Sequence, residues 1–239
     1  KNDKPEIDIA VDPLEGTNFA ANNLPGAMSV IAATYKNNLL HAPETYMDKI
    51  AYGSNVEKDV VDLDNNFNQN IKNLADFKNK NIEDMSICVL DRPRHSEIIN
   101  EAKKLNVKIK LISDGDVSGA ILVTNEKYGV DIFLGIGGGP EGVLAACALD
   151  AYNCGFQGRF IFDDDKSIKR ANDMGITDLK RKYNLTDIVM GDSIFCATGI
   201  TETEITAAVK KENTKFVTET LVTHKESTIE IIKSEEAIA

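Results

Sequence analysis

The chain is poor in basic residues. Its 239 residues include 27 Lys and Arg against 38 Asp and Glu, which gives a formal net charge of −11. A chain this acidic repels nucleic acids and anionic membranes at long range, so we expect neither as a partner. An anionic substrate would have to be neutralised locally, and metal ions held by carboxylates can do this.

Cysteines are few, and long apolar runs are absent. No C-x-x-C pair occurs among Cys88, Cys147, Cys154 and Cys196. Their mostly apolar surroundings predict buried, reduced thiols and favour a cytoplasmic protein. No stretch approaches the roughly 20 apolar residues of a membrane helix. The polar segment 1–6 shows no secretory signal.

The three histidines give no catalytic or metal-binding pattern. No Ser-His-Asp or Cys-His arrangement can be recognised. His41 and His224 have no companions at metal-ligand spacing, and His95 is expected to begin a helix rather than to act in catalysis.

The first third of the chain favours an antiparallel arrangement. We expect strands at 7–12 and 27–36, then a turn at 37–38 into a third strand around 39–42. The segment 67–79 has the apolar spacing of a helix.

Beyond residue 80, strands alternate with helices. The expected strands are 86–90, 107–112, 130–134 and 159–162, and the expected helices are 95–105, 117–124 and 140–152. This alternation indicates α/β units with a largely parallel sheet. The end of the chain predicts a strand at 193–200, a helix near 203–211 and a hairpin over 215–233 that turns near Lys225.

The first candidate site lies in the sequence IDIAVDPLEGTNF, residues 7–19. Asp12 falls at the carboxyl end of a strand, where open α/β sheets place their ligands. The proline and glycine around Glu15 permit a turn that points both acids at one place, with Thr17 beside them. Paired carboxylates with a backbone carbonyl between them suit Mg²⁺ or Mn²⁺. The alternative is an ordinary Asx-type turn at a helix start.

A second motif, GIGGGPEG, supports a rival hypothesis. Its glycines match G-x-G-x-x-G, and the acids 163–165 follow about 20 residues later, as in a dinucleotide-binding fingerprint. However, Glu141 lies in the first helical turn, where it would repel a pyrophosphate unless a cation lay between them. A dinucleotide site would also leave Asp12 and Glu15 without a role.

The motif DPLEGT resembles the D-P-[IL]-[DE]-G-[ST] signature of the lithium-sensitive, metal-dependent sugar and inositol phosphatase superfamily. The order of the later motifs resembles that of bacterial class II fructose-1,6-bisphosphatases in particular, over nearly the whole chain. These motifs are APETYMDKIAYG (42–53), DRPRH (91–95), SDGDV (113–117), GIGGGPEGV (135–143) and FCATGIT (195–201).

The resemblance implies an α/β fold, a layered α-β-α-β-α sugar-phosphatase-like sandwich acting as one integrated catalytic unit. Residues 1–80 would be the remainder of an antiparallel metal-site half, and 81–239 the α/β substrate-binding half. In the family, helices and further acids precede the first strand, so we expect the first α/β layer to be incomplete here. Apolar surface on the first sheet would then be exposed and would favour self-association.

The resemblance also implies an activity, the metal-dependent hydrolysis of the 1-phosphate of fructose 1,6-bisphosphate in gluconeogenesis. Mn²⁺ or Mg²⁺ would be held by Asp12, Glu15, Glu141 and the Leu14 carbonyl, with Asp12, Glu15 and Thr17 catalytic. Arg92, Arg94 and Tyr46 would hold the distal phosphate. The full set of implied substrate-binding residues is Glu15, Gly16, Thr17, Tyr46, Arg92, Pro93, Arg94, Asp114, Gly115, Asp116 and Gly138.

Several alternatives remain open at this point. The substrate could be sedoheptulose 1,7-bisphosphate or an inositol phosphate, although the two-arginine loop suits a second phosphate better than an inositol ring. A nucleotide-dependent oxidoreductase and a non-catalytic remnant that binds a sugar phosphate or a partner chain are the other possibilities. The family suggests a homodimer or tetramer.

Overall fold

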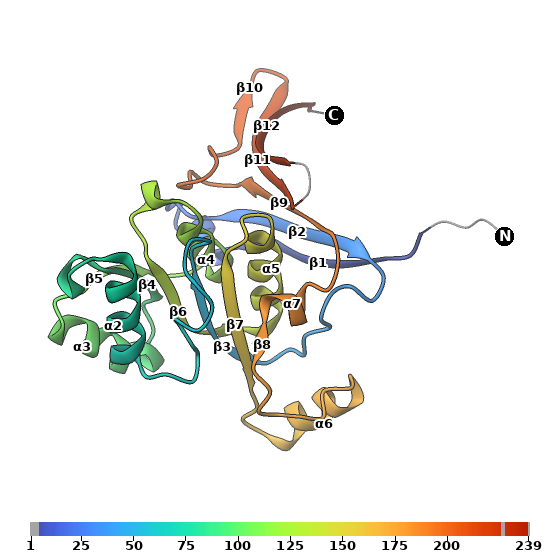
Figure 1. Ribbon diagram of the computed structural model, residues 1–239. Coiled ribbons are helices and arrows are strands. Elements are labelled where there is room, and N and C mark those ends of the chain that lie inside the picture. Colours follow the sequence, from blue (N-terminus) through green and yellow to red (C-terminus); the bar gives the residue numbers. More distant parts are fainter. Residues whose placement is uncertain (1–4, 226–227, 239) are drawn as a thin grey trace.

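The computed structural model describes residues 5–225 and 228–238, which form two sheets with helices between and beside them (Figure 1). The first sheet is antiparallel throughout. Its order is β1 (Ile7–Glu15), β2 (Met28–Tyr35), β9 (Ser193–Gly199), β11 (Lys215–His224) and β10 (Lys210–Glu212), and β12 (Thr228–Ala237) pairs with β11.

The second sheet is mixed. Its order is β5 (Lys108–Ile112), β4 (Ser86–Leu90), β6 (Ile132–Gly138), β3 (Tyr46–Tyr52), β7 (Gly155–Ile161) and β8 (Tyr183–Asn184). The strands joined through helices, β5, β4 and β6, are parallel, whereas β3 runs antiparallel to both β6 and β7. The prediction of a largely parallel sheet is therefore right for half of this sheet, because β3 inserts between β6 and β7.

Helices α4 (Asp116–Ile121) and α5 (Gly139–Asp150) lie between the sheets (Figure 1). They share one core cluster with β2 of the first sheet and β3 of the second. On the far face of the second sheet, α2 (Phe67–Lys78) and α3 (Ser96–Lys104) pack over β4 in a separate cluster. The order of layers in the described chain is thus β-α-β-α, and the predicted layered α/β class is confirmed.

The remaining helices are short. They are α1 (Thr17–Ala21), α6 (Asp165–Asp173) and α7 (Leu185–Ile188), with 3₁₀ turns at Ile82–Asp84, Pro93–His95, Leu122–Thr124 and Glu126–Tyr128. At α6, the Asp164 carboxylate accepts a hydrogen bond from the Ser167 N–H at 2.7 Å, which caps the helix.

Two predicted elements are wrong. Residues 39–42 form no strand; Leu39 makes a single bridge to Val189, and the third strand is β3 instead. No helix forms at 203–211. The Thr203 hydroxyl accepts hydrogen bonds from the N–H groups of Ile205 and Thr206, and this local bonding closes a turn in place of a helix.

The two sheets do not divide at residue 80. Strand β3 comes from the first part of the chain but belongs to the second sheet, and β9 to β12 come from the last part but complete the first sheet. The predicted hairpin over 215–233 is β11 and β12. Lys225 lies in a turn after β11, and residues 226–227 lie outside the described residues.

The cysteines are free thiols in the interior. Cys88, Cys147 and Cys154 are buried and Cys196 is half-buried. Burial raises the pKa of Cys88 and of Cys147 to about 12, so these thiols stay protonated and unreactive. Among the residues that the structure describes, no helix has the length and apolar character needed to span a bilayer.

The outer face of the first sheet is apolar and exposed. Ile7, Ile9 and Val11 of β1 are 53–56% exposed, and Tyr35 and Ile31 lie opposite two of them in register. Residues paired across antiparallel strands share a face, so these side chains form one continuous apolar surface. The described part of the chain leaves it uncovered.

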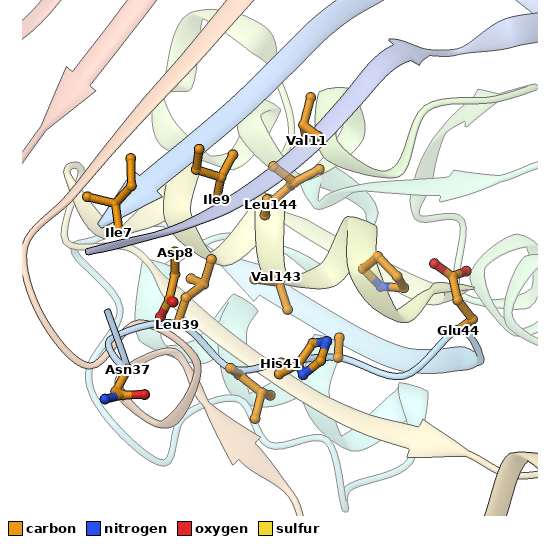
Figure 2. Close-up of a pocket in the computed structure, with 14 residues that line it drawn as sticks. Ile7, Asp8, Ile9, Val11, Asn37, Leu39, His41, Glu44, Val143 and Leu144 are labelled. Carbon is orange, nitrogen blue, oxygen red and sulfur yellow. The ribbon is translucent and has the colours of Figure 1, made fainter. Parts of the chain in front are cut away.

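A groove of about 550 Å³ runs along β1, which is an edge strand of this sheet. Figure 2 shows that Ile7, Ile9 and Val11 of β1 lie along one side of the groove, and Val143 of α5 and His41 of the loop between β2 and β3 also line it.

We expect the apolar surface to cause concentration-dependent self-association. Ile31 lies in the middle of it, between β1 and β9, so Ile31→Lys should shift sedimentation toward the monomer. The change in unfolding free energy should be below about 1 kcal/mol because the side chain is already exposed. Leu111→Lys, at an exposed apolar residue of the other sheet, is the control and should leave association unchanged. Equal effects of both variants would contradict this assignment.

Candidate active site

The end of β1 turns two acids in different directions. The β1–β2 register shifts between Asp12 and Glu15, so a bulge separates them. The Asp12 carboxylate accepts a hydrogen bond from the Leu14 N–H at 2.9 Å, which closes the turn. Glu15 is buried and accepts a hydrogen bond from the Val117 N–H of α4 at 2.6 Å.

Glu15 and Glu141 lie in one cluster of carboxylates. Burial, together with the charges of Asp116, Asp12 and Glu141, raises the pKa of Glu15 to about 8. Burial also raises the pKa of Glu141, and the charges of Asp116 and Asp12 add to this effect. The three predicted ligand side chains are therefore close enough for their charges to interact, and Asp116, which the resemblance places among the substrate-binding residues, belongs to the same group.

The glycines of β6 make room for this cluster. A Cβ atom at Gly137 would overlap the Asp116 carboxylate, and one at Gly138 would overlap the Glu141 carboxylate. Protein carboxylates thus occupy the space that a dinucleotide pyrophosphate would need, which argues against the dinucleotide hypothesis.

Lys49 of β3 completes the interior of the site, and sequence reasoning missed it. Its side chain is 1% exposed and forms an ion pair with Asp116. Its Nζ also donates a hydrogen bond to the Gly138 carbonyl at 2.9 Å. The sequence did contain a signal for its burial. Lys49 is two residues from Met47 and from Ala51, so it shares their face of the strand, and both pack in the core between the sheets.

Four of the predicted substrate-binding residues form two pairs. Arg92 lies 3.6 Å from the Asp114 carboxylate, which also accepts a hydrogen bond from the Asn18 N–H at 3.0 Å. The Arg94 guanidinium lies 4.9 Å from the centroid of the Tyr46 ring. Each arginine is thus held by another residue of the predicted substrate set.

A proline or a glycine fixes the backbone where each helical turn near these pairs begins. Pro93 opens a 3₁₀ turn directly after Arg92. Gly115, with φ of 89°, precedes α4 in the left-handed conformation that glycine adopts easily. Gly16, with φ of 78°, does the same before Thr17, which is exposed at the start of α1.

Phe19 holds α1 against these loops and was also missed. A Cβ atom at Gly16 or Gly26 would lie 2.8 or 2.7 Å from its ring, and one at Gly115 would lie 3.6 Å away. The ring therefore packs directly on three backbone segments and fixes where the helix with Thr17 starts.

His95 begins α3 and joins two strand ends. Its Nε2 accepts a hydrogen bond from the Ile136 N–H at 2.7 Å, so Nδ1 carries the proton and donates to the Leu90 carbonyl at 2.8 Å. Burial lowers the pKa of the ring and keeps it neutral. Both ring nitrogens are used in holding β4 to β6, a structural role.

The carboxylate cluster fits a divalent cation in its donor chemistry. Carboxylate oxygens are the ligands that Mg²⁺ and Mn²⁺ prefer. Asp116 Oδ1 is buried with no hydrogen-bond partner among the described atoms. No three His, Cys, Asp or Glu side chains in this part of the chain are already gathered as a metal-binding group, so the carboxylates would have to close around an ion.

A cavity of about 390 Å³ opens beside Glu141. Tyr46, Gly138, Asp163 and Asp164 line it together with Glu141. It gives a ligand access to the carboxylate cluster from the Tyr46 side.

Glu15 should make the stability of the metal-free protein depend on pH. Its pKa rises from 4.5 in the unfolded chain to about 8 on folding, so the folded state keeps a proton that the unfolded state releases. The free energy of unfolding should therefore fall as pH rises from about 5 to 8, by at most ~1.4 kcal/mol per pH unit. Denaturant unfolding in EDTA measures this.

Glu15→Gln should flatten that profile, because glutamine does not titrate. Glu97→Gln, at an exposed acid of α3, is the matched control and should keep the native slope. A native profile that is flat or rises between these pH values would contradict the prediction.

Comparison with known proteins agrees with this geometry. A family model described as "Bacterial fructose-1,6-bisphosphatase, glpX-encoded" matches residues 1–236. A protein of Trichodesmium erythraeum (strain IMS101) is 37% identical over 209 residues, which cover 82% of this chain and 60% of that protein. A protein of Prochlorococcus marinus (strain NATL1A) is 38% identical over 232 residues, which cover 91% and 69%.

Both relatives are named D-fructose 1,6-bisphosphatase class 2/sedoheptulose 1,7-bisphosphatase. The matched part of this chain corresponds to 60–69% of their length. The match over 1–236 includes every motif that carried the resemblance, and the chain belongs to the bacterial, glpX-encoded fructose-1,6-bisphosphatase family.

Proposed function

We propose that this chain carries the site for metal-dependent hydrolysis of the 1-phosphate of fructose 1,6-bisphosphate, giving fructose 6-phosphate and phosphate in gluconeogenesis. The observation that carries the proposal is the cluster of Asp12, Glu15, Asp116 and Glu141, in which Glu15 and Asp116 are buried and Asp12 and Glu141 are half-buried. Family membership and the names of the relatives support the same activity.

The residues divide the work by position. Asp12, Glu15 and Glu141, with the Leu14 carbonyl, would hold Mn²⁺ or Mg²⁺. A bound ion of this kind supplies Lewis-acid stabilisation of the phosphoryl oxygens and of the leaving group. Thr17 is exposed at the start of α1, so its hydroxyl can orient the attacking water.

The arginine pairs suit the distal phosphate. A guanidinium has five N–H donors, and Arg94 uses its Nε on the Ile136 carbonyl at 2.8 Å, so the group is oriented before substrate arrives. Arg92 and Tyr46 complete this phosphate site in the proposal. In the proposal, Gly16, Pro93, Gly115 and Gly138 also contact the substrate.

Asp114 and Asp116 would bind the sugar. Asp114 is fixed by the Asn18 N–H and by Arg92. Asp116 presents the buried Oδ1, which can accept a hydrogen bond from a sugar hydroxyl.

A second candidate substrate is sedoheptulose 1,7-bisphosphate, because the relatives carry both names. It has the same phosphate chemistry and one more carbon, so the same residues would serve it. We further propose a cytoplasmic location, which the buried free thiols support, and a homodimer or tetramer, which the exposed face of the first sheet supports.

Replacing Glu141 tests the proposal. Glu141→Gln removes one predicted ligand charge, so Mn²⁺-dependent phosphate release from fructose 1,6-bisphosphate should fall by at least about 100-fold with little loss of folding. Glu97→Gln, also in a first helical turn, is the control and should keep native activity.

Native activity in Glu141→Gln, or phosphate release that persists in excess chelator, would overturn the assignment. Binding of the sugar bisphosphate without turnover by the native protein would favour the non-catalytic alternative.

A further inference from the structure

Lys49 is a buried cation inside the carboxylate cluster. It lies in β3, the strand between β6 and β7, and is 1% exposed. A lysine is rarely buried this fully unless it is paired. Here its Nζ meets the Asp116 carboxylate and the Gly138 carbonyl, the first at the start of α4 and the second directly before α5.

A glycine of the neighbouring helix leaves room for the Lys49 side chain. On α5, a Cβ atom at Gly142 would lie 3.3 Å from Lys49 Cδ, closer than most side chains tolerate. A long side chain can therefore pass between strand and helix to reach the end of β6.

The charge of Lys49 also acts on its neighbours. The Nζ of Lys49 binds the Gly138 carbonyl, and the Glu141 carboxylate packs against Gly138, so the lysine charge lies near this acid. At the other end, one Asp116 oxygen pairs with Lys49, and the second, Oδ1, has no partner among the described atoms. The ion pair thus leaves one oxygen in a fixed position.

We propose that Lys49 is a positioning residue that holds Asp116 as an acceptor for a sugar hydroxyl and sets how strongly the neighbouring carboxylates attract a divalent cation. This inference rests on the proposed function for the identity of the substrate. It predicts opposite effects on two binding steps, which a purely structural role would not give.

The direction of each effect follows from charge and geometry. Without the lysine charge, the carboxylates of Asp116 and Glu141 attract a cation more strongly. Without its hydrogen bond, Asp116 is no longer held in place, and the substrate hydroxyl loses an oriented partner. Lys49→Met should therefore bind Mn²⁺ more tightly and the sugar bisphosphate more weakly.

The experiment measures both constants in the same variants. Mn²⁺ binding is followed by electron paramagnetic resonance without substrate, and phosphate release gives KM and kcat. We expect Lys49→Met to bind Mn²⁺ about three- to tenfold more tightly. Its KM should rise about tenfold, and more than kcat falls.

Lys78→Met is the matched control. Lys78 also pairs with a buried aspartate, Asp131, but in a different part of the second sheet, and Lys80 remains to pair with Asp131 when Lys78 is replaced. Mn²⁺ affinity and KM of this variant should stay within about twofold of native.

Asp116→Asn keeps the test decisive if Lys49→Met fails to fold. It removes a negative charge and leaves the lysine charge uncompensated, so Mn²⁺ binding should weaken about three- to tenfold. Native Mn²⁺ affinity in Lys49→Met or in Asp116→Asn would overturn the inference.

The two proposals fail in different ways. A native protein that binds Mn²⁺ but releases no phosphate would refute the proposed function, while the Mn²⁺ affinities of the variants would still decide the role of Lys49. A native protein that hydrolyses the substrate, with Lys49→Met unchanged in both constants, would refute the inference alone.

Discussion

Two acids of the site, Glu15 and Asp116, are buried, and the half-buried acids Asp12 and Glu141 lie near them. Such burial is unfavourable unless each charge is paired, protonated or balanced by a cation. Glu15 avoids an unpaired charge by keeping its proton, since its pKa is raised to about 8. Asp116 avoids it by forming an ion pair with Lys49. These groups come from three separate elements, β1, α4 and α5, which the fold brings close together.

The acids of the site come from both sheets, so the chain has to cross between the sheets to bring them together. Strand β1 of the first sheet delivers two of the acids, whereas β6 of the second sheet leads into α5 and delivers Glu141. The buried faces of α4 and α5 pack between the sheets and fix the distance between these strand ends. Because α4 donates the Val117 N–H to Glu15, the same helix that joins the layers also fixes an acid of the site.

Much of this could be predicted from local sequence, and the failures have physical causes. Strand alternation and helical spacing located most elements, because burial on one face imposes a period on the sequence. The prediction of a strand at 39–42 was wrong, because the turn residues at 37–38 do not indicate where the next strand begins or which sheet it will join. Lys49 and Phe19 were missed because their roles depend on contacts with residues far away in sequence, such as Asp116 and Gly115.

The glycine-rich motif shows why a residue pattern needs a physical test. In a dinucleotide site, glycines let the backbone approach a pyrophosphate at a helix N-terminus. Here the space above Gly137 and Gly138 is filled by carboxylates of the protein itself. The same glycine spacing can therefore occur at a site for an anionic ligand and at a cluster of carboxylates that attracts a cation. In a chain of net charge −11, the second arrangement would let an acidic protein bind an anionic substrate if the cluster holds a cation, because the cation would lie between the two negative charges.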